Sequence, residues 1–398
     1  MTTADRPRLL FYCQHAVGLG HLARSLALAD GLARQFDVLL LNGGRMPSGT
    51  RIPDGVQVLN LPALGHDEVF DLVSHEPGMT VDEIVAMRPG MLLAALRDHR
   101  PEVVLVELFP FGRKKFRFEL LPFLDAIDGL GAARPLVACS LRDILVGSRR
   151  DQAGHDEKAS RLANRYFDAV LMHADPAFAR LSESFAPATA LEVPVHYTGF
   201  VAPEAAAVDA VAVERERRVI VSAGGGSVGG PLVRAALAAQ RRLRTEAGLA
   251  TTIITGPFAP DEVFAEAAAV AAVTESLTVL RHVPDLCGEM RRSAVTVSQC
   301  GYNTAMDILR AGTPAVVVPY AEGREDEQRR RVERLERLGV LKGMDPGVLD
   351  GTTLADAVLE RLSSPVAPVT LDLEGRHHTA RILRDLVAAR ASSVGAAG

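Results

Sequence analysis

The chain has 398 residues, of which 48% are hydrophobic and 23% are charged, and its formal net charge at pH 7 is -5. This composition is that of a globular protein, and the negative charge argues against nucleic acid as a partner, because phosphate backbones are bound by clustered Lys and Arg. The length favours two domains. Neither a signal-peptide pattern nor an apolar run of about 18 residues is found, so we expect a cytoplasmic protein.

Short apolar segments alternate with helical segments through the first half of the chain. Strands that are buried on both faces are expected at residues 8–13, 37–42, 56–61, 102–107, 135–140 and 168–173. Strands of this kind joined by helices predict a doubly wound parallel sheet with right-handed crossovers. We therefore place an α/β, Rossmann-like N-terminal domain at residues 1–200.

The pattern is interrupted after residue 200 and then restarts. An Ala-rich stretch at residues 201–216 contains Pro203 and no clear strand, which indicates an interdomain linker. A second Rossmann-like domain is expected at residues 217–373. Residues 374–398 are expected to form a C-terminal helix that packs back on the first domain, followed by a loose tail. Strands of the second domain are expected at residues 218–223, 251–255, 277–280, 294–298 and 315–319.

The first strand leads into a turn that contains two glycines, and a helix begins there. Gly18 and Gly20 allow the backbone to turn tightly, and the helix N-terminus offers unpaired N–H groups to an anionic or polar ligand. The turn departs from the GxGxxG dinucleotide fingerprint, because Ala23 fills the third glycine position and Asn42 stands where an acid is required. NAD is therefore disfavoured.

His21 follows this turn, on the side of the sheet where parallel strands end and ligands bind. A neutral imidazole there can take a proton from an incoming hydroxyl, whereas a histidine that only packs the loop is the alternative. Glu107 ends the strand at residues 102–107 and is expected to orient a histidine, with an exposed loop acid as the alternative. His15 is a second candidate base.

A segment that interleaves aromatic and cationic residues follows that strand, at residues 109–118. Binding to nucleic acid or to a membrane surface is one interpretation of this pattern. We favour a loop on the acceptor or phosphate side, with Arg113 as its main residue. Arg142 follows the next strand and is a further candidate on the same edge, although a buried ion pair explains it equally well.

In the second half, the strand at residues 218–223 is followed by a loop with five glycines. Glycines beside a helix N-terminus permit the close backbone approach that a diphosphate requires, and Ser227 adds a hydroxyl donor. The loop lacks the GKS or GKT ending of a P-loop, so ATP hydrolysis is not indicated. The candidate phosphate-binding residues are Gly224, Gly225, Gly226 and Ser227.

A second ligand-binding edge is predicted between residues 298 and 328. There a strand, a glycine turn, a helix that carries Asp307, another strand and a polar loop follow one another. A carboxylate suits ribose hydroxyls, and Glu327 with Gln328 suits the hydroxyls of a sugar. Positions on an exposed helix surface would explain each of these side chains as well. The turn and the helix start add Ser298, Gly301, Tyr302, Asn303 and Thr304 as candidates.

Together these motifs resemble the GT-B glycosyltransferases, most closely the group of the undecaprenyldiphospho-muramoylpentapeptide GlcNAc transferase, with its family 28 C-terminal domain, and related predicted bacterial glycosyltransferases. The resemblance implies two Rossmann-like domains that face each other across a cleft and bind a nucleotide-sugar. By this resemblance residues 224–227 and 298–304 meet the donor phosphates, Asp307 binds the ribose, and Glu327 with Gln328 reads the sugar.

The nucleobase, by the same resemblance, is recognised by backbone groups around Arg281, His282 and Val283. UDP is the default, and dTDP and GDP stay open. Three features depart from the family pattern: its ribose acid is usually Glu, its sugar pair is typically Gln-Gln or Asp-Gln, and the base-stacking Trp of plant-type members has no counterpart in this Trp-free chain.

In the first half, Gly18, Gly20 and His21 resemble the acceptor loop of the family, whose histidine is the general base in many inverting members. The resemblance implies an inverting transfer that requires neither metal nor cofactor. The spacing of Gly18, Gly20, His21 and Arg24 also fits a nucleotide-sugar hydrolase of the pseudaminic acid pathway with the same fold. A non-hydrolysing 2-epimerase, with Glu107 and Glu119 among its carboxylates, and a non-catalytic nucleotide-sugar binder are further alternatives.

The remaining expectations concern metals and partners. No DxD motif is present, and the cysteines form no CxxC pair, so neither a zinc site nor a disulfide framework is indicated. The acceptor stays open among small molecules, lipids and peptides, and so do peripheral membrane contact and the oligomeric state. The cysteines, expected to be reduced, are Cys13, Cys139, Cys287 and Cys300.

Overall fold

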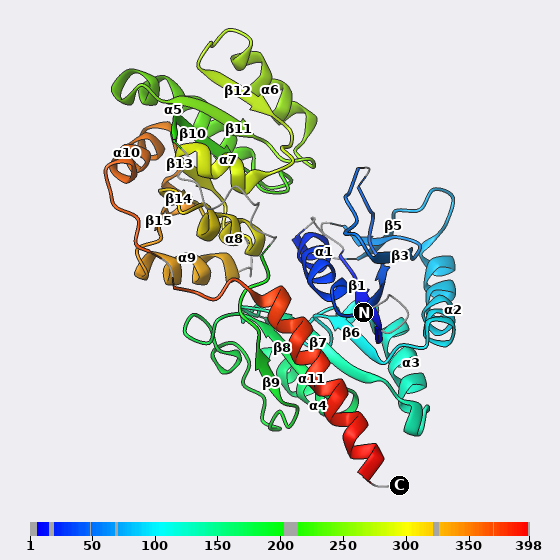
Figure 1. The fold of residues 1–398 in the computed structure, drawn as a ribbon. Coiled ribbons are helices and arrows are strands. Elements are labelled where there is room, and N and C mark those ends of the chain that lie inside the picture. The colour runs from blue at the N-terminus through cyan, green and yellow to red at the C-terminus, as the bar shows by residue number, and fades with distance from the viewer. Residues whose placement is uncertain are drawn as a thin grey trace. The chain divides into compact units, whose positions relative to one another are not determined.

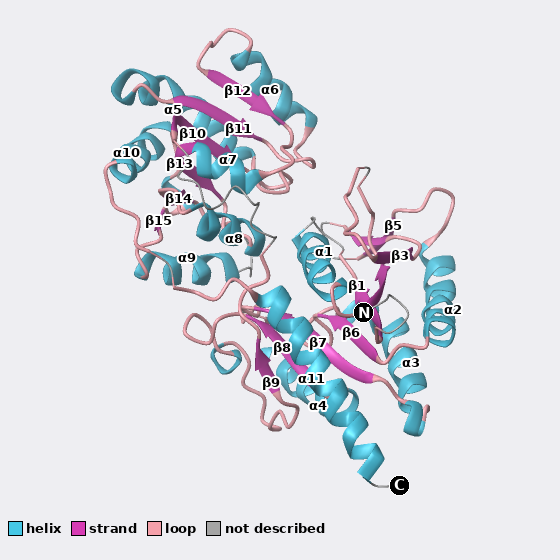
Figure 2. Cartoon of the chain, viewed as in Figure 1, coloured by secondary structure: helices cyan, strands magenta, loops and turns pink. Residues whose placement is uncertain are grey.

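The structure is a computed structural model that describes residues 6–15, 20–47, 49–67, 71–147, 149–202, 214–320, 326–368 and 370–396. The chain forms two compact units (Figure 1). The first consists of residues 1–145, 149–203 and 371–398, and the second of residues 146–148 and 204–370. Figure 2 shows that strands surrounded by helices form the centre of each unit.

The first unit is built on a seven-stranded sheet in the order β3-β2-β1-β6-β7-β8-β9, in which every neighbouring pair is parallel. The chain therefore builds one half of the sheet outward from β1 and then returns to place β6 on the other side of β1. The strands are β1 (Arg8–Cys13), β2 (Asp37–Asn42), β3 (Val56–Asn60), β6 (Val103–Glu107), β7 (Leu136–Arg142), β8 (Ala169–His173) and β9 (Val195–Tyr197).

Helices cover both faces of this sheet because side chains alternate along a strand. Leu9 and Phe11 of β1 share a buried core with Leu28 of α1, whereas Tyr12 points to the other face and donates a hydrogen bond to Glu119 of α3. This arrangement is the doubly wound sheet that the apolar runs predict. The helices are α1 (Gly20–Ala33), α2 (Val81–His99), α3 (Arg117–Asp128), α4 (Gln152–Tyr166) and α11 (Gly375–Ala396), with short 3-10 turns η2 (Lys114–Phe116), η3 (Gly131–Ala133) and η4 (Leu181–Glu183).

A small hairpin in the first unit was not expected from the sequence. It consists of β4 (Leu64–His66) and β5 (Leu72–Ser74), which pair antiparallel outside the main sheet. Each strand has three residues, too few to show an alternating apolar pattern, so this segment resembles a loop in the sequence.

The C-terminal helix belongs to the first unit. Helix α11, red in Figure 1, packs against α1, and its residues Ala380 and Leu383 are fully buried in the same core as Leu28. A Cβ atom on Gly31 would lie 2.8 Å from the backbone oxygen of Arg376, so the two helices approach closely because residue 31 is glycine. The helix continues to Ala396, further than expected.

The second unit has a six-stranded parallel sheet in the order β12-β11-β10-β13-β14-β15. The short edge strand β15 was not expected. The strands are β10 (Glu216–Ser222), β11 (Ala250–Ile254), β12 (Leu277–Leu280), β13 (Ser293–Ser298), β14 (Ala315–Val317) and β15 (Leu341–Gly343). The helices are α5 (Gly230–Ala247), α6 (Asp261–Ala271), α7 (Leu286–Arg292), α8 (Tyr302–Ala311), α9 (Glu327–Arg337), the 3-10 turn η6 (Pro346–Val348) and α10 (Gly351–Leu362).

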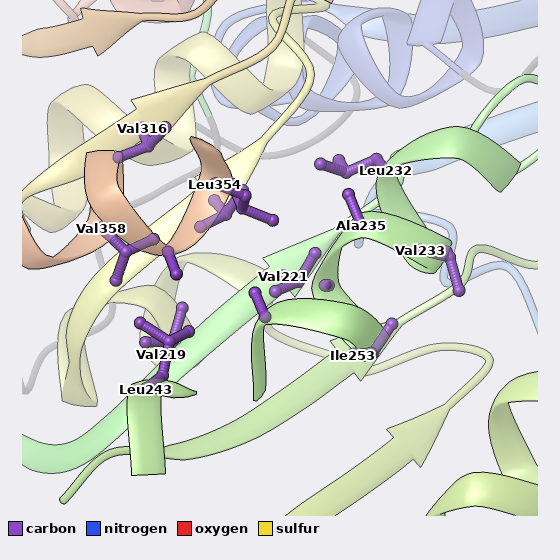
Figure 3. Close-up of a cluster of buried hydrophobic side chains, with 14 of the residues drawn as sticks. Val219, Val221, Leu232, Val233, Ala235, Leu243, Ile253, Val316, Leu354 and Val358 are labelled. Atoms are coloured by element: carbon purple, nitrogen blue, oxygen red, sulfur yellow. The ribbon is translucent and has the colours of Figure 1, made fainter. Parts of the chain in front are cut away.

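The core of the second unit joins one face of its sheet to two helices that are far apart in the sequence. Figure 3 shows Val221 of β10 together with Leu232 of α5 and with Leu354 and Val358 of α10, all of which are at most 2% exposed. Burying side chains of this size stabilises the folded state by about 1.5–3 kcal/mol each. A Cβ atom on Gly351 would lie 2.4 Å from that of Ala238, so the glycine allows α10 to begin directly against α5.

The chain passes between the units near residue 203 and returns near residue 371. Most of the expected linker, residues 203–213, lies outside the described residues. On the side of the first unit, Val201 forms an antiparallel bridge with Glu374, and the backbone N–H of Phe200 donates to the carbonyl of Asp372 at 2.7 Å. The outgoing and returning segments are therefore paired. Among the helices of the described residues, none is long and apolar enough to span a membrane.

Candidate active site

The first candidate site lies at the ends of β1 and β6, where the strand order of the first unit changes direction: β2 and β3 follow on one side of β1, and β6 to β9 on the other. Strands β1 and β6 are neighbours in the sheet, but the chain connects β1 to β2 on the opposite side. Loops that leave two such strands in opposite directions open a crevice at their carboxyl ends, where α/β proteins bind ligands. His21 lies in the first turn of α1, which follows β1, and Glu107 is the last residue of β6.

A hydrogen bond joins these two side chains. Nδ1 of His21 lies 2.7 Å from Oε1 of Glu107, and the carboxylate is fully buried whereas the His21 side chain keeps 18% of its surface exposed. Arg24, one helical turn further along α1, donates to the same carboxylate oxygen. A proton on Nδ1 that is directed at Glu107 leaves Nε2 of His21 with a lone pair, which is the form of imidazole that can accept a proton.

The charges around His21 favour its neutral form. Burial alone would raise the pKa of Glu107, but His21, Arg113 and Arg24 outweigh it and hold that pKa below its usual range. Burial and the positive charge of Arg113 lower the pKa of His21 to about 3, against the opposing attraction of Glu107. At neutral pH the site therefore holds an ionised carboxylate and a neutral imidazole.

The loop after β6 positions Arg113 on the other oxygen of Glu107, where its Nε lies 3.5 Å from Oε2. Two non-glycine residues of this loop have left-handed backbone angles, Leu108 with φ 66° and Arg113 with φ 57°. Such angles are uncommon and cost energy, and they concentrate at functional sites. Gly112 permits the tight turn, because a Cβ atom there would lie 2.7 Å from the Leu108 side chain.

The other candidates of the first half have different surroundings. His15 is buried, and Nε2 of its ring would lie 2.6 Å from a Cβ atom on Gly44, so it packs inside the loop. Gly20 is the first residue of α1, and Gly18 lies outside the described residues. Arg142 ends β7 at the same edge of the sheet as Glu107.

A buried polar network next to this site was not predicted. Arg88 of α2 is fully buried and binds both carboxylate oxygens of Glu119, at 2.7 and 2.6 Å, and the hydroxyl of Tyr12 donates to the same carboxylate at 2.5 Å. Nη2 of Arg88 also donates to Oε1 of Gln14 at 2.7 Å. Glu119 is thus engaged within the protein, which removes it as a carboxylate offered to a ligand.

A sequence signal for this network exists. Ile84, Arg88 and Leu92 recur every four residues on α2, and this spacing places Arg88 on the apolar, buried face of the helix. A buried arginine needs a carboxylate partner. The side chain of Gln14, which Arg88 orients, follows β1 and donates to the carbonyl of Leu64 at 3.1 Å. The network therefore fixes Gln14, the residue that directly follows β1.

The second candidate site lies at the corresponding change of direction in the second unit. Strands β10 and β13 are neighbours, and their last residues, Ser222 and Ser298, are paired in the register. The loops that follow them therefore begin side by side. The side-chain oxygen of Gln299 would lie 3.8 Å from a Cβ atom on Gly224, so the glycine-rich loop and the turn after β13 are adjacent.

The glycine-rich loop depends on its glycines. Gly224 and Gly226 have positive φ angles of 62° and 95°, and a Cβ atom on Gly226 would lie 2.5 Å from the carbonyl oxygen of Thr255. Helices α5 and α8 begin after Gly229 and Gly301, residues that have no side chain to cap the first N–H groups. Uncapped N–H groups at two neighbouring helix starts favour an anion. Ser227 is exposed in the same loop.

Asp307 lies on α8 next to a second carboxylate. Burial, and then the negative charge of Asp285, raise the pKa of Asp307 to about 7, with Arg310 opposing. Asp285 is the N-cap of α7, where its side chain accepts from the N–H of Gly288 at 2.8 Å, and it directly follows the loop after β12. The structure thus brings the candidate ribose acid beside the segment expected to read the nucleobase.

In that segment Arg281 is held by α6. Its guanidinium lies 4.3 Å from the centre of the Phe264 ring and donates to Asp261 at 2.5 Å. The carbonyl of Arg281 accepts a hydrogen bond from the N–H of Gly256 at 3.0 Å. His282 is exposed and Val283 is half-buried. The expectation that backbone groups here meet a base stays a prediction.

Gln328 and Glu327 begin helix α9. Oε1 of Gln328 accepts from the backbone N–H groups of Cys300 and Tyr320, at 3.0 and 3.1 Å, and so ties the turn after β13 to the end of β14. This bridging contact was not predicted, and it leaves the side-chain N–H groups of Gln328 to donate to a ligand. Glu327 is 6% exposed.

The start of α8 packs against α9. The guanidinium of Arg331 lies 5.9 Å from the centre of the Tyr302 ring, and its Nη1 donates to the carbonyl of Cys300 at 2.8 Å. Tyr302 is therefore 8% exposed, and Asn303 and Thr304 are half-buried in the first turn. Tyr302 belongs to the packing of this turn more than to its surface.

Within the described ranges, no group of three or more His, Cys, Asp or Glu side chains is placed to hold a metal ion. All four cysteines are free thiols, and Cys13, Cys139 and Cys300 are buried.

Comparisons with known proteins identify this architecture. Residues 220–379 match the model of the glycosyltransferase family 28 C-terminal domain. The comparison with curated protein sequences found no match. Among solved structures, the glycotransferase of kitacinnamycin superimposes with a TM-score of 0.61 at 16% identity, covering 97% of this chain and 100% of that one. MurG of Acinetobacter baumannii gives 0.57 at 15% identity, with 95% and 100% covered.

A putative UDP-N-acetylglucosamine 2-epimerase from Listeria monocytogenes also shares the fold, with a TM-score of 0.54, 15% identity, and 95% and 91% of the two chains covered. Identities this low establish a common fold and leave the activity open. The chain has the GT-B fold of two parallel-sheet α/β domains, as the sequence predicted. The match of residues 220–379 to the family 28 C-terminal domain, together with the shared fold, supports the resemblance to the GT-B glycosyltransferases.

Proposed function

We propose that the protein is an inverting glycosyltransferase that moves a hexose from a nucleotide-sugar, by default a UDP-sugar, to a hydroxyl group of an acceptor. The observation that carries this proposal is the pair formed by His21 and Glu107, at 2.7 Å, where the strand order of the first unit changes direction. A neutral imidazole held by a buried carboxylate is the arrangement that activates a hydroxyl as a nucleophile.

In the proposed reaction, Nε2 of His21 takes the proton of the acceptor hydroxyl as its oxygen attacks the anomeric carbon. The new carbon–oxygen bond forms on the face opposite the leaving group, and the bond to the diphosphate breaks with its electron pair on the phosphate oxygen. The configuration at the anomeric carbon is therefore inverted. Glu107 stabilises the imidazolium that forms and keeps Nε2 directed at the acceptor.

The charge that develops on the leaving diphosphate is met in the second unit. The N–H groups at the starts of α5 and α8 and along residues 224–227 are preorganised donors for it. These groups supply the stabilisation that a divalent ion supplies in other transferases, so the proposal includes no metal. Asp307 is assigned to the ribose, residues 281–283 to the base, and Glu327 with Gln328 to the transferred sugar.

A nucleotide-sugar hydrolase is the second candidate, and the contact between Arg24 and Glu107 favours it. Arg24 completes the motif that the hydrolase shares, and its guanidinium helps to keep Glu107 ionised. In that reaction water replaces the acceptor hydroxyl at the same base. The 2-epimerase is disfavoured, because Glu119, one of the carboxylates it was expected to use, is fully engaged by Arg88 and Tyr12.

One experiment separates these functions. The protein is incubated with a panel of nucleotide-sugars, with and without a small-molecule and lipid extract of cells, and mass spectrometry follows the nucleotide and the sugar. Acceptor-dependent release of the nucleotide supports transfer. Release of free sugar at full rate without extract would replace transfer by hydrolysis, and an isomerised sugar would indicate epimerisation.

A further inference from the structure

A cavity of about 350 Å³ lies within the first unit, between the loop that follows β6 and helix α4. We call it the α4 pocket. Its floor is apolar and includes Phe109, Ala159 and Leu162. Its lining also includes five cationic side chains, three from residues 113–117, one from the segment before α4 and one from α4 itself, and these are Arg113, Lys114, Arg117, Arg149 and Lys158.

The positive charge of the α4 pocket is balanced in part from within the protein, because Arg113 pairs with Glu107 and Arg149 donates to Gln152. Against its five cations the lining includes one carboxylate, Asp151, which caps α4 by accepting from the N–H of Gly154 at 2.9 Å. Among the ion pairs of the described residues, none includes Lys114, Arg117 or Lys158. Nε of Arg117 is buried and has no hydrogen-bond acceptor in the described part of the chain.

Cations just outside the pocket are paired. Lys115, the neighbour of Lys114, binds Asp71 at 2.7 Å, and Arg161, on the next turn of α4 after Lys158, binds Glu157 at 2.7 Å. The unpaired positive charge therefore lies at Lys114, Arg117 and Lys158 of the pocket and does not extend to these neighbouring cations. Arg117 is half-buried, whereas Lys114 and Lys158 are exposed. The buried Nε of Arg117 is therefore the group for which an absent acceptor is costly, unless a ligand supplies the negative charge.

We propose that the α4 pocket binds a phosphate group of the acceptor substrate, so that the acceptor is a phosphorylated molecule. This inference rests on the proposed transfer reaction. Guanidinium groups match phosphate oxygens in bidentate geometry, and three cations without an ion-pair partner among the described residues suit a dianion better than a carboxylate ligand with a single charge. The volume accommodates a phosphate together with a small organic group.

The pocket also contacts the catalytic pair. Arg113 lines the α4 pocket and at the same time lies 3.5 Å from Glu107, which binds His21. Both the pocket and the base belong to the first unit, whereas most of the match to the family 28 domain, residues 220–370, lies in the second. A phosphate bound here therefore belongs to the acceptor side of the reaction and not to the nucleotide-sugar.

The test measures binding by isothermal titration calorimetry with glycerol 3-phosphate as the probe, in the presence of saturating UDP so that donor-phosphate sites are filled. The pocket variant is Arg117→Gln with Lys158→Gln. The matched control, Lys115→Gln with Arg161→Gln, removes the same charge from the same two segments outside the pocket. We expect the pocket variant to weaken binding by about tenfold or more, and the control to bind like the wild type.

Equal weakening in both double variants, no weakening in either, or equally tight binding of glycerol or glycerate would overturn the proposal. Circular dichroism establishes that the variants fold. If the pocket variant does not fold, Lys158→Gln alone repeats the test, because this side chain is exposed.

A second titration compares phosphatidylcholine vesicles with and without phosphatidic acid. If the wild type prefers the vesicles that contain phosphatidic acid and the pocket variant loses this preference, the phosphate belongs to a lipid headgroup.

The test of phosphate binding in the α4 pocket can fail or succeed independently of the proposed transfer reaction. Probe binding needs no turnover, so a protein that hydrolyses nucleotide-sugars without an acceptor but shows the expected variant pattern keeps the phosphate site and loses the transfer reaction. Conversely, phosphatase treatment of the cell extract, followed by removal of the phosphatase, should abolish acceptor-dependent nucleotide release. Undiminished release with treated extract would overturn a phosphorylated acceptor while leaving transfer intact.

Discussion

Arg113 lies 3.5 Å from one carboxylate oxygen of Glu107, the oxygen that His21 does not contact. Arg24 reaches the oxygen that His21 binds, so two guanidinium groups and one carboxylate surround a single imidazole. A proton on His21 would add a third positive charge to one negative charge in a buried site. The cluster is therefore arranged to hold a neutral base.

Replacing the base should abolish chemistry without abolishing donor binding. We expect His21→Ala to lower kcat about 100-fold or more, because the acceptor hydroxyl loses its proton acceptor, while the Kd for UDP stays unchanged. Steady-state kinetics and calorimetry measure the two effects. His377→Ala, on α11, is the control and should leave kcat unchanged. Near-normal turnover of His21→Ala would reject the general base.

The pH profile of kcat should show no histidine titration in its usual range. Because burial and Arg113 lower the pKa of His21 to about 3, the imidazole is already neutral throughout the working range. We expect kcat at saturating donor to be flat between about pH 5 and 8. An acid limb with an apparent pKa near 6.5, absent in a variant with another base, would contradict this charge assignment.

Donor affinity should depend on pH through Asp307. Burial and the charge of Asp285 raise the pKa of Asp307 to about 7, so below that pH the side chain is largely protonated and has lost the charge that attracts ribose hydroxyls. UDP should therefore bind more tightly as the pH rises from 6 to 8, by up to about tenfold. Calorimetry measures this change, and Asp307→Asn gives the background due to the nucleotide itself.

The neighbouring carboxylate supplies a sharper test of the same interaction. Asp285→Asn removes the negative charge that helps to raise the pKa of Asp307, so the rise in affinity should move to lower pH. The Asn side chain can still cap α7, which limits other effects. An unchanged midpoint would mean that Asp285 does not control the ionisation of Asp307.

The glycine-rich loop should tolerate one substitution and not its neighbour. Gly226→Ala places a methyl group against the backbone of Thr255 and Ala259 at a φ of 95°, so we expect the loop to shift and UDP affinity to fall about tenfold or more. A Cβ atom on Gly225 meets nothing closer than 3.9 Å, so Gly225→Ala should bind UDP nearly normally. Equal losses in both variants would show that bulk, and not backbone geometry, limits this site.

The features that sequence reasoning predicted follow from strong local signals. Apolar runs such as residues 8–13 and 277–280 become strands with the expected bounds, and polar residues at strand ends gather where the sheet order changes direction. His21 and Glu107 are 86 positions apart, yet their places at the ends of two strands were enough to expect them together. In a parallel sheet all strands end at the same edge, so residues that end different strands lie near one another even when they are far apart in the sequence.

Other features depend on contacts that no local pattern encodes. The α4 pocket combines residues 113–117 with residues 149–158, and only the packing of α4 beside the loop after β6 brings their charges together. The bridging contact of Gln328 with Cys300 and Tyr320 likewise depends on the start of α9 lying beside the ends of β13 and β14. The polar residues after each strand predicted a ligand-binding edge of the sheet. They did not indicate which side chains point toward a ligand and which, like Gln328, bind the protein backbone.

The network of Arg88, Glu119 and Tyr12 should contribute to stability and not to chemistry. Glu119→Ala leaves the guanidinium of Arg88 buried without its carboxylate, so we expect the first unit to lose about 3–5 kcal/mol of unfolding free energy. Denaturant unfolding followed by circular dichroism measures the loss, with hydrogen exchange to attribute it to the first unit. Arg88→Met combined with Glu119→Leu replaces the pair by apolar side chains of similar size and should cost less than Glu119→Ala alone, because no charge is stranded. If the double variant is the less stable of the two, the ion pair itself, rather than the avoidance of an unpaired charge, is what holds α2 and α3 against β1.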